Sequence, residues 1–367
     1  MRVTVIGAGI VGSAIAFHLA RRGTQVTLLD ADKPGMGASS HSFAWINAFG
    51  KEPRHYNELN RRSLDTWDRY ARLLNADVGL RWGGQLTWSA TDEDAEWLRE
   101  NVAKLQSWGY IARLIDEAQL VHLEPGLRPG PVSAAAISEN DGHVLGTKAA
   151  QVASRRVAEL GGLVRLNPPA LGLDVSGKEI AAVQVESESI DCDAVVLAAG
   201  VTTTEIAGTA NVEVPQYESP GVVVKTNSLP QLIESASVLY APPISEDQPE
   251  IHIRQGADGV VMIGEGTQES LARDDSQEHA DRLLARAAHY LPALSAAQAI
   301  PVPVGYRPMP RDEMPILGFT ESVPNLYIAL THSGITLAPL IGEFATMEIL
   351  DGARIDLLDP FRLERFV

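Results

Sequence analysis

The first thirty residues, MRVTVIGAGIVGSAIAFHLARRGTQVTLLD, constrain the fold of this chain more than any other segment. The apolar run at residues 3–6 predicts a buried strand, and it leads directly into Gly7, Gly9 and Gly12. In this G-x-G-x-x-G spacing the first glycine permits a tight turn and the second lets the backbone approach a pyrophosphate. The third lets a helix pack closely on the strand, so the segment predicts the start of a nucleotide-binding unit.

A helix and a second strand follow in the order that a dinucleotide-binding βαβ unit requires. The helix begins at Ile10, carries two arginines in its last turn and stops at Gly23. Residues 26–29 predict the second strand, and Asp30 ends it in position to accept hydrogen bonds from the hydroxyls of an adenosine ribose. Because a carboxylate there would repel a ribose 2′-phosphate, the segment predicts NAD or FAD and leaves that choice open.

Composition excludes several classes of partner. The chain has 367 residues, 45% of them apolar, which suffices for one large domain or about two ordinary ones. Its formal net charge of −17 predicts repulsion of nucleic acids and anionic membranes, although such a charge also serves solubility alone. No run approaches the roughly 20 apolar residues of a membrane span, and the apolar N-terminus is expected to be a strand rather than a signal peptide.

Cysteine usage favours a reducing compartment. Cys192 is the only cysteine, so no disulfide can form within the chain, and we expect a cytoplasmic protein. The sequence has no Cys/His cluster with the spacing of metal ligands. We therefore predict no metal site.

Helical and strand patterns alternate along the rest of the chain. Helices are expected over residues 53–74, 92–108, 147–160, 276–291 and 336–350, with Pro339 in the first turn of the last one. Strands are expected over residues 86–88, 163–166, 180–186, 194–200, 222–225, 238–240, 251–254, 260–263 and 326–330. The dense β pattern between residues 221 and 263 predicts a mostly antiparallel sheet in a second domain.

Three further segments combine small residues with polar ones. Residues 37–41 read GASSH, a loop of small and hydroxyl side chains, and residues 194–200 read AVVLAAG, a buried strand that ends in small residues. Near the end, GYRP at 305–308 is followed by THSGITLAP at 331–339. Small residues at a strand end let a ligand or another backbone lie close.

Together with the N-terminal unit, these segments resemble the D-amino-acid oxidase (DAO) family of FAD-dependent oxidoreductases, and in particular its glycine oxidase-like and sarcosine oxidase-like members. GASSH resembles the stretch that the family places against the flavin and ribityl chain, and VVLAAG resembles its strand beside the cofactor. The tail resembles the family's G-x-R-P and G-H-x-x-G-x-x-L-A-P endings. The resemblance spans almost the whole chain, with its four segments in the right order.

This resemblance implies a two-domain α/β architecture. One domain is a Rossmann-type FAD-binding domain assembled from discontinuous segments, and the other is an α+β substrate domain with a mostly antiparallel sheet. We expect residues 1–85, 145–215 and 305–367 in the FAD-binding domain. Residues 86–144 and 216–304 are expected in the substrate-binding domain.

The chain departs from the family pattern in ways that bear on the cofactor. Asp30 stands where the family usually has glutamate, and Thr331 stands where a glycine commonly precedes the histidine. Sarcosine oxidases attach the flavin through a cysteine after the G-Y-R-P stretch, and no cysteine follows Pro308 here. The resemblance therefore implies non-covalent FAD. A covalent link through His41, as some relatives make through a histidine, is the alternative.

The residues expected to bind FAD lie in the four segments. The hydroxyls of Ser39 and Ser40 suit phosphate or ribityl oxygens, and the amides at the start of the last helix can stabilise negative charge on the reduced flavin. The whole expected set is Gly7, Gly9, Ile10, Val11, Gly12, Asp30, Ala31, Gly37, Ala38, Ser39, Ser40, His41, Trp45, Ala199, Gly200, Gly334, Ile335, Thr336 and Leu337.

Three side chains are candidates for catalysis. Arg307 is the expected substrate clamp, because a planar guanidinium holds a carboxylate through two parallel hydrogen bonds and so aims the rest of the substrate. The resemblance places His332 beneath the flavin, where it would hydrogen-bond the ring or influence substrate protonation. His252 lies near a strand position where the family can use a tyrosine for the carboxylate. A structural role is the alternative for each.

The resemblance implies an enzyme that oxidises the C–N bond of a small amine or amino acid. A hydride would pass from the substrate Cα to flavin N5, the imine would hydrolyse in water, and oxygen or another acceptor would take the electrons. Two other interpretations are open. The chain could be a non-catalytic or partner-dependent flavin-binding subunit of an electron-transfer complex. An NAD-dependent dehydrogenase would explain the first thirty residues but not the later segments.

Overall fold

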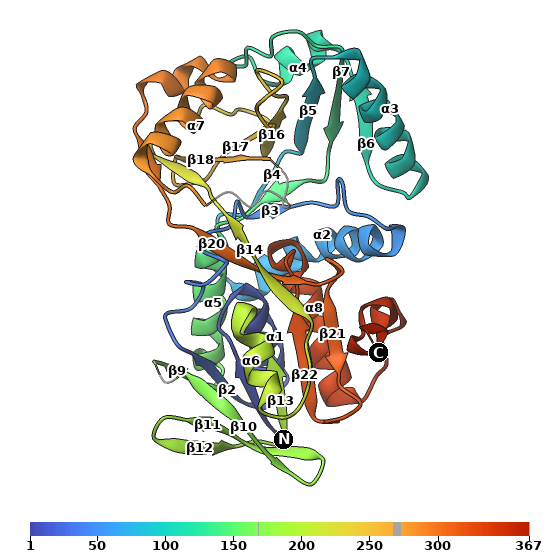
Figure 1. Cartoon of the computed structure of the whole chain (residues 1–367), viewed down its shortest axis with the longest axis vertical. Helices are drawn as coiled ribbons and strands as arrows, with labels where there is room; N and C mark the ends of the chain where they lie inside the picture. Colours follow the sequence, from blue (N-terminus) through green and yellow to red (C-terminus); the bar gives the residue numbers. More distant parts are fainter. Residues whose placement is uncertain (168, 267–272, 367) are drawn as a thin grey trace.

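A computed structural model of the protein describes residues 1–167, 169–266 and 273–366. The chain forms two parts, and both chain ends lie in the lower one in Figure 1. A two-stranded antiparallel ribbon of β14 (Gln216–Gly221) and β20 (Gly305–Pro310) runs between the two parts (Figure 1). Each part is built on its own large sheet.

The lower part is built on a six-stranded sheet. Its strand order is β21 (Ile316–Phe319), β22 (Leu326–Leu330), β13 (Ala194–Leu197), β1 (Arg2–Ile6), β2 (Gln25–Asp30) and β9 (Leu163–Leu166). All neighbours pair in parallel except β21 and β22. The sheet joins strands from the start, middle and end of the chain, which agrees with the expected α/β fold.

Two layers cover the two faces of this sheet. On one face lie α1 (Ile10–Arg21), α2 (Arg54–Leu74), α5 (Gly146–Glu159) and α8 (Gly334–Asp351). On the other lie α6 (Thr203–Gly208) and a three-stranded sheet of β10 (Ala170–Ser176), β11 (Glu179–Val185) and β12 (Glu188–Asp191). Successive side chains of β1 point to opposite faces of the sheet. Val3 and Val5 therefore pack with the helices on one face, whereas Ile6 packs with the small sheet on the other.

The upper part is built on an eight-stranded sheet. Its order is β19 (Ala299–Pro301), β15 (Val224–Ser228), β18 (Val260–Glu265), β17 (Ile251–Gln255), β16 (Val238–Ala241), β5 (Gln85–Ser89), β7 (Ala134–Ser138) and β6 (Ala112–Ile115). Only β16 and β5 pair in parallel, so the sheet is mostly antiparallel, as expected. The helices α3 (Asp92–Ser107), α4 (Glu117–Leu123) and α7 (Gln277–Tyr290) belong to this part (Figure 1).

A small sheet and four short 3-10 helices complete the described chain. The sheet has the order β3 (Trp45–Ile46), β8 (Gly142–His143) and β4 (Arg81–Trp82). The 3-10 helices are η1 (Gly200–Thr202), η2 (Pro292–Ala296), η3 (Asp356–Phe361) and η4 (Leu363–Phe366). In Figure 1 the small sheet lies between the two large ones. Its strand β3 is followed by the loop of residues 47–53, which leads into α2.

Several elements differ from the expected ones. The strand expected at 222–225 begins at Val224, because Gly221 instead ends β14 opposite Gly305 of β20. The last helix begins at Gly334, which packs on the N-terminus of α1, so Pro339 lies in the second turn rather than the first. Strand β7 was not expected, since its sequence AAAIS lacks the alternation of a half-buried strand.

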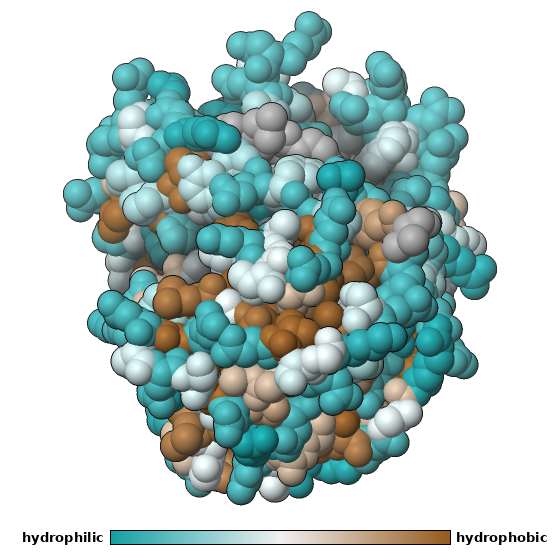
Figure 2. All heavy atoms as spheres, turned by 60° about the horizontal axis from the view of Figure 1, so that its bottom comes forward, coloured by the Kyte–Doolittle hydropathy of each residue, from teal (hydrophilic) through white to brown (hydrophobic). Residues whose placement is uncertain are grey.

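The surface agrees with the acidic composition. Figure 2 shows hydrophilic side chains over most of the face on the side of β10–β12, with smaller apolar groups between them. Within the described ranges, no helix combines the length and apolarity that crossing a membrane needs.

Candidate active site

A cavity of about 620 Å³ contains most of the residues that the sequence singled out. Its lining combines the glycine loop after β1, the 37–51 segment, the end of β13, the start of β20 and the N-terminus of α8. Strands of the upper sheet contribute Thr87, Tyr240 and His252. The volume falls in the range of small-molecule and cofactor sites.

The glycine loop shapes one end of this cavity. Gly7 has φ +103°, and a Cβ there would lie 2.3 Å from Ala198 O. A Cβ on Gly12 would lie 1.9 Å from Gly7 O, so both positions exclude any side chain. Gly9 is the N-cap of α1, provides no side-chain cap and lines the cavity. The loop therefore offers backbone amides and a helix N-terminus to an anion, as a diphosphate requires.

Asp30 lies beside this loop at the end of β2. One carboxylate oxygen accepts the Ala8 N–H at 2.5 Å, and the other accepts the Asp32 N–H at 2.9 Å. Burial raises the pKa of Asp30, and the backbone donors oppose that rise. The carboxylate lines the cavity within reach of the glycine loop, which suits a ribose next to a diphosphate.

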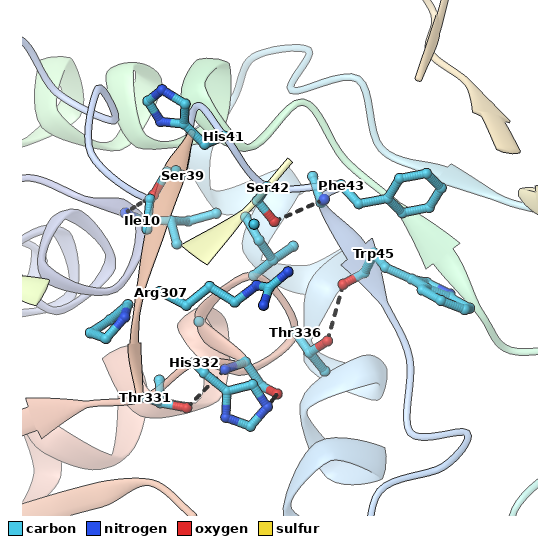
Figure 3. Close-up of a pocket in the computed structure, with 18 of the residues that line it drawn as sticks. Ile10, Ser39, His41, Ser42, Phe43, Trp45, Arg307, Thr331, His332 and Thr336 are labelled. Carbon is cyan, nitrogen blue, oxygen red and sulfur yellow. Dashed lines mark hydrogen bonds between the residues drawn. The ribbon is translucent and has the colours of Figure 1, made fainter. Parts of the chain in front are cut away.

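The 37–41 segment closes over the loop. Ser39 Oγ accepts the Ile10 N–H at 3.2 Å, so it already contacts the N-terminus of α1 (Figure 3). Ser40 Oγ donates to Met36 O at 2.8 Å and lies 3.0 Å from His41 Nδ1, so these contacts of Ser40 stay within its own segment. The His41 side chain packs against Gly305 of β20. The His41 ring points away from Arg307 in Figure 3.

A second helix N-terminus opens on the same cavity. Helix α8 begins at Gly334 after Ser333, whose side chain makes no cap, and Gly334, Ile335 and Thr336 line the cavity. Thr336 Oγ1 donates to Trp45 O and accepts the Asn47 N–H, each at 3.2 Å. Two helix N-termini whose N-cap residues provide no side-chain cap face one cavity. They fit a ligand with two separate electron-rich ends, as FAD has in its diphosphate and its flavin.

Arg307 projects from β20 into the middle of the cavity (Figure 3). Its Nη1 donates to Ser219 Oγ at 3.1 Å and to Pro220 O at 3.2 Å, both on the paired strand β14. A Cβ on Gly221 would lie 2.4 Å from Arg307 Nη2, so that glycine makes room for the guanidinium. The strand ribbon thus orients a cation toward the space between α8 and the upper sheet.

His332 lies next to Arg307 at the start of α8 (Figure 3). Its Nε2 lies 3.2 Å from Ser333 Oγ and 3.5 Å from the hydroxyl of Tyr56, which itself lies 2.6 Å from Ser333 Oγ. Burial lowers the pKa of His332 well below its usual value, and the charges of Lys51 and Arg307 lower it further. The imidazole is therefore neutral at physiological pH.

Aromatic rings form the wall opposite Arg307. The ring centroids of Tyr240 and His252 are 4.4 Å apart, and those of Trp45 and His252 are 5.6 Å apart. Phe43 packs edge-on against both Trp45 and His252. Burial lowers the pKa of His252 to about 4, and its Nε2 has no hydrogen-bond partner among the described residues. This wall is largely apolar, and two of its buried polar atoms, His252 Nε2 and Trp45 Nε1, have no hydrogen-bond partner among the described residues.

The lining separates the expected site residues into two groups. All three catalytic candidates, Arg307, His332 and His252, line the cavity. Of the expected cofactor residues, the lining includes Gly7, Gly9, Ile10, Val11, Asp30, Gly37, Ala38, Ser39, His41, Trp45, Ala199, Gly200, Gly334, Ile335 and Thr336. It does not include Gly12, Ala31, Ser40 and Leu337. Gly12 packs against Gly7 instead, and Leu337 is fully buried in the core.

Other lining residues have no motif that would have marked them. Lys51, Phe49 and Asn47 follow β3, and Trp97 comes from α3 with 58% of its surface exposed. The only signal is the position of residues 47–51 between the small β3 strand and α2, where the chain passes the cavity. In the described parts of the chain, no group of three or more His, Cys, Asp or Glu side chains could hold a metal ion.

Comparisons with known proteins give matches that cover nearly the whole chain. Residues 2–347 match the DAO family, described as FAD dependent oxidoreductase. One of the opine oxidase subunits of Agrobacterium tumefaciens (strain Ach5) is 27% identical over 99% of this chain and 97% of that protein. Glycine oxidase of Geobacillus kaustophilus is 24% identical over 100% of this chain and 97% of that protein.

Solved structures share the fold. The crystal structure of glycine oxidase from Geobacillus kaustophilus superposes with a TM-score of 0.88 at 23% identity, over 100% of this chain and 99% of the other. L-proline dehydrogenase from P. horikoshii gives 0.86 at 22% identity, over 100% and 98%. A nucleotide cradle, a second helix N-terminus and a family match over nearly the whole length lead to one conclusion. The chain belongs to the DAO family of FAD-dependent oxidoreductases, and FAD is its cofactor.

Proposed function

We propose that this enzyme oxidises the C–N bond of a small amine or amino acid that carries a carboxylate. The observation that carries the proposal is the Arg307 guanidinium, which projects into the cavity between the N-terminus of α8 and the aromatic wall. The names of its relatives support the same class, because they include opine, glycine and 4-methylaminobutanoate oxidases. When bound, FAD supplies an electron sink that takes a hydride from the carbon next to nitrogen.

The side chains around that position have separate tasks. Arg307 holds the substrate carboxylate through its planar fork, while Ser219 and Pro220 fix the guanidinium from behind. Because His252 and His332 are neutral, neither repels a substrate amine that approaches them. The rings of Phe43 and Trp45 exclude water from the space beside the clamp. None of the roles requires a strong side-chain base.

Replacement of Arg307 tests this proposal. Arg307→Met should lower kcat/KM for the best amino-acid substrate about 100-fold, which corresponds to about 2.7 kcal/mol. Arg307→Lys should recover only part of that loss, since an ammonium keeps the charge but lacks the fork. Exposed Arg311 provides the matched control, and Arg311→Met should leave kcat/KM within about twofold. Full activity of Arg307→Met would contradict the proposal that Arg307 binds the substrate carboxylate.

A partner-dependent flavoprotein is the second candidate function. The two opine oxidase relatives, by their names, are each one subunit of an enzyme. Anaerobic reduction of the bound flavin by a panel of D-, L- and N-methyl amino acids separates the two candidates. Bleaching by a panel member supports an enzyme that works alone, whereas a flavin that no panel member reduces favours the partner-dependent flavoprotein. Hydrogen peroxide formation in air then distinguishes oxygen from another electron acceptor.

We also propose a cytoplasmic location, because the single cysteine, Cys192, is what a protein of a reducing compartment is expected to have.

A further inference from the structure

Two aromatic side chains at the α3 side of the cavity have no task in the proposed chemistry. Phe49 belongs to the loop between β3 and α2, Trp97 belongs to α3, and both line the cavity. Trp97 leaves 58% of its surface exposed. Among the residues that the structure describes, neither ring packs on another aromatic ring or on a cation. Ligand cavities are lined mainly by apolar and aromatic side chains, so we treat this pair as a ligand contact and name it the aromatic entrance.

One face of α3 meets the loop that carries Phe49. Lys104 of α3 forms an ion pair with Glu52 near the end of that loop. Trp97 precedes Lys104 by seven residues, so it lies two turns and about 10 Å away on the same face of the helix. Figure 1 shows the loop after β3 rising toward α3. The loop and the helix therefore place Phe49 and Trp97 on two sides of one opening of the cavity.

The loop of the aromatic entrance is held in place by buried contacts. The Ala48 N–H donates to the hydroxyl of Tyr110 at 3.1 Å, and Ala48 O accepts from Asn57 Nδ2 at 2.8 Å. Both anchoring side chains are buried. Since Glu52 is also paired, Phe49 lies between two fixed points of the chain. The entrance is thus formed before a ligand arrives, which lowers the entropic cost of binding there.

Strand pairing connects the aromatic entrance to the aromatic wall. His252, Tyr240 and Thr87 lie opposite one another on β17, β16 and β5, and all three line the cavity. Neighbouring strands are about 4.8 Å apart, so this row extends about 10 Å across the sheet. Helix α3 packs on β5 at the Thr87 end of the row. The cavity therefore continues from the wall opposite Arg307 to Trp97.

We propose that the aromatic entrance binds an aromatic ring of the substrate, so that the enzyme prefers an amino acid or amine that ends in such a ring. This inference rests on the proposed function, because it assumes that Arg307 holds the other end of the same molecule. Flat rings attract one another in offset-stacked and edge-to-face arrangements, and Trp97 and Phe49 offer two rings from separate elements. A ring bound there lies away from the reacting carbon and adds affinity rather than chemistry.

Inert carboxylates test the aromatic entrance without any oxidation, since they have no amine nitrogen. Propionate has no ring, whereas 3-phenylpropionate and 4-phenylbutyrate carry a phenyl ring at two distances from the carboxylate. Perturbation of the flavin absorbance of the FAD-loaded enzyme gives a Kd for each ligand. At least one of the two phenyl acids should bind about tenfold or more tightly than propionate. Trp97→Ala should remove that preference and change the Kd of propionate less than about threefold.

Controls separate this role from general effects. Trp97→Phe should keep most of the preference, since it retains a flat ring. Leu114→Ala removes an exposed apolar side chain of β6 outside the lining and should leave every Kd unchanged. The cyclohexyl counterpart of the better phenyl acid should bind more weakly, because it cannot stack. If no phenyl acid is preferred, or if Trp97→Ala keeps the preference or weakens propionate equally, the aromatic entrance is wrong.

The same ligands separate this inference from the proposed function. Arg307→Met should weaken propionate and both phenyl acids alike, because all three share the carboxylate. If Arg307→Met changes no Kd while Trp97→Ala removes the phenyl preference, the carboxylate clamp is wrong and the aromatic entrance is supported. If Arg307→Met weakens every ligand while Trp97→Ala weakens none, the clamp is supported and the entrance is wrong.

The reaction gives a second and separate measurement. Alanine and phenylalanine share the reacting centre and differ by one phenyl ring. For the enantiomer that reduces the flavin, kcat/KM should be at least about tenfold higher with phenylalanine. Trp97→Ala should raise the KM of phenylalanine with little change in kcat, since the ring binds equally in the ground and transition states. An unchanged KM, or a loss confined to kcat, would contradict the role of Trp97.

Discussion

At the scale of the residue, burial keeps several histidines neutral. Desolvation lowers the pKa of His18 and His143 to about 3 and that of His252 to about 4. His18 stacks on Tyr70 between helices α1 and α2, with ring centroids 5.7 Å apart. In the unfolded chain each of these rings takes up a proton near pH 6.5. The folded state therefore binds fewer protons than the unfolded state at mildly acidic pH.

This difference makes stability depend on pH with a definite sign. Since the unfolded chain binds the extra proton, the free energy of unfolding rises with pH between the folded and unfolded pKa values and falls as the pH drops below about 6.5. Each buried histidine contributes up to about 1.4 kcal/mol per pH unit in that window. In His18→Gln, one proton fewer should be taken up on unfolding, so the slope of the free energy of unfolding against pH should fall by about 1.4 kcal/mol per pH unit. Urea unfolding at several pH values between pH 4 and pH 6 measures this slope.

Exposed His289 supplies the control for that slope. His289→Gln, which removes an exposed ring, is measured in the same assay, and the loss of slope should be larger in His18→Gln. Equal slopes in His18→Gln and the native protein would mean that the His18 ring can be protonated in the folded state.

At the scale of the element, the glycine loop couples β1 to α1. Gly12 sits in the first turn of α1, and a Cβ there would meet Gly7 O at 1.9 Å, Gly7 C at 3.0 Å and the Ala198 side chain at 3.2 Å. Two of these contacts are backbone atoms of the loop itself. The loop must therefore move before any larger residue fits, and the diphosphate cradle moves with it.

Gly12→Ala adds one methyl group at this contact and so tests whether the diphosphate-binding loop depends on it. We expect it to lose at least about 2 kcal/mol of stability and to retain little FAD after gel filtration, measured by the ratio of absorbance at 450 nm to that at 280 nm. Gly208→Ala is the matched control, because a Cβ at that helical position meets nothing within 4 Å. A Gly12→Ala protein that keeps a full complement of FAD would contradict the predicted close packing of α1 on the loop.

At the scale of the whole molecule, the cavity draws on both large sheets. The glycine loop and α8 belong to the six-stranded sheet, whereas Thr87, Tyr240 and His252 come from the eight-stranded one. The ribbon of β14 and β20 places Arg307 between them. A cofactor bound in this cavity contacts both parts and should stabilise them together.

Cofactor removal should therefore destabilise the entire molecule. At a free FAD concentration 100 times its Kd, binding adds about 2.7 kcal/mol to the free energy of unfolding, and the thermal midpoint should rise by several degrees over that of the apoprotein. Riboflavin, which lacks the diphosphate and adenosine, is the control and should raise the midpoint much less at the same concentration. An equal rise with riboflavin would mean that the glycine loop and Asp30 contribute nothing to binding.

Much of the cofactor end was predictable because its signals are local. The strand, glycine turn and helix of the first unit follow one another without interruption, and the structure has them at Arg2–Ile6 and Ile10–Arg21. Thr91 caps α3 by accepting the Asp94 N–H, again a contact between neighbours in the chain. Strand β7 was missed because it is buried among its neighbours and has no alternation of its own. The domain boundaries and the residue roles are still predictions.

What the sequence determined by itself is the βαβ unit and a dinucleotide as its ligand, because both depend on residues that are close along the chain. The choice of FAD came from the resemblance of four separate segments to one family. The tertiary structure decided what surrounds the substrate. Lys51 has no motif, and only the buried anchors of its loop bring it near Arg307, 256 positions later in the chain. Contacts over such separations depend on how sheets and helices pack, so no local pattern encodes them.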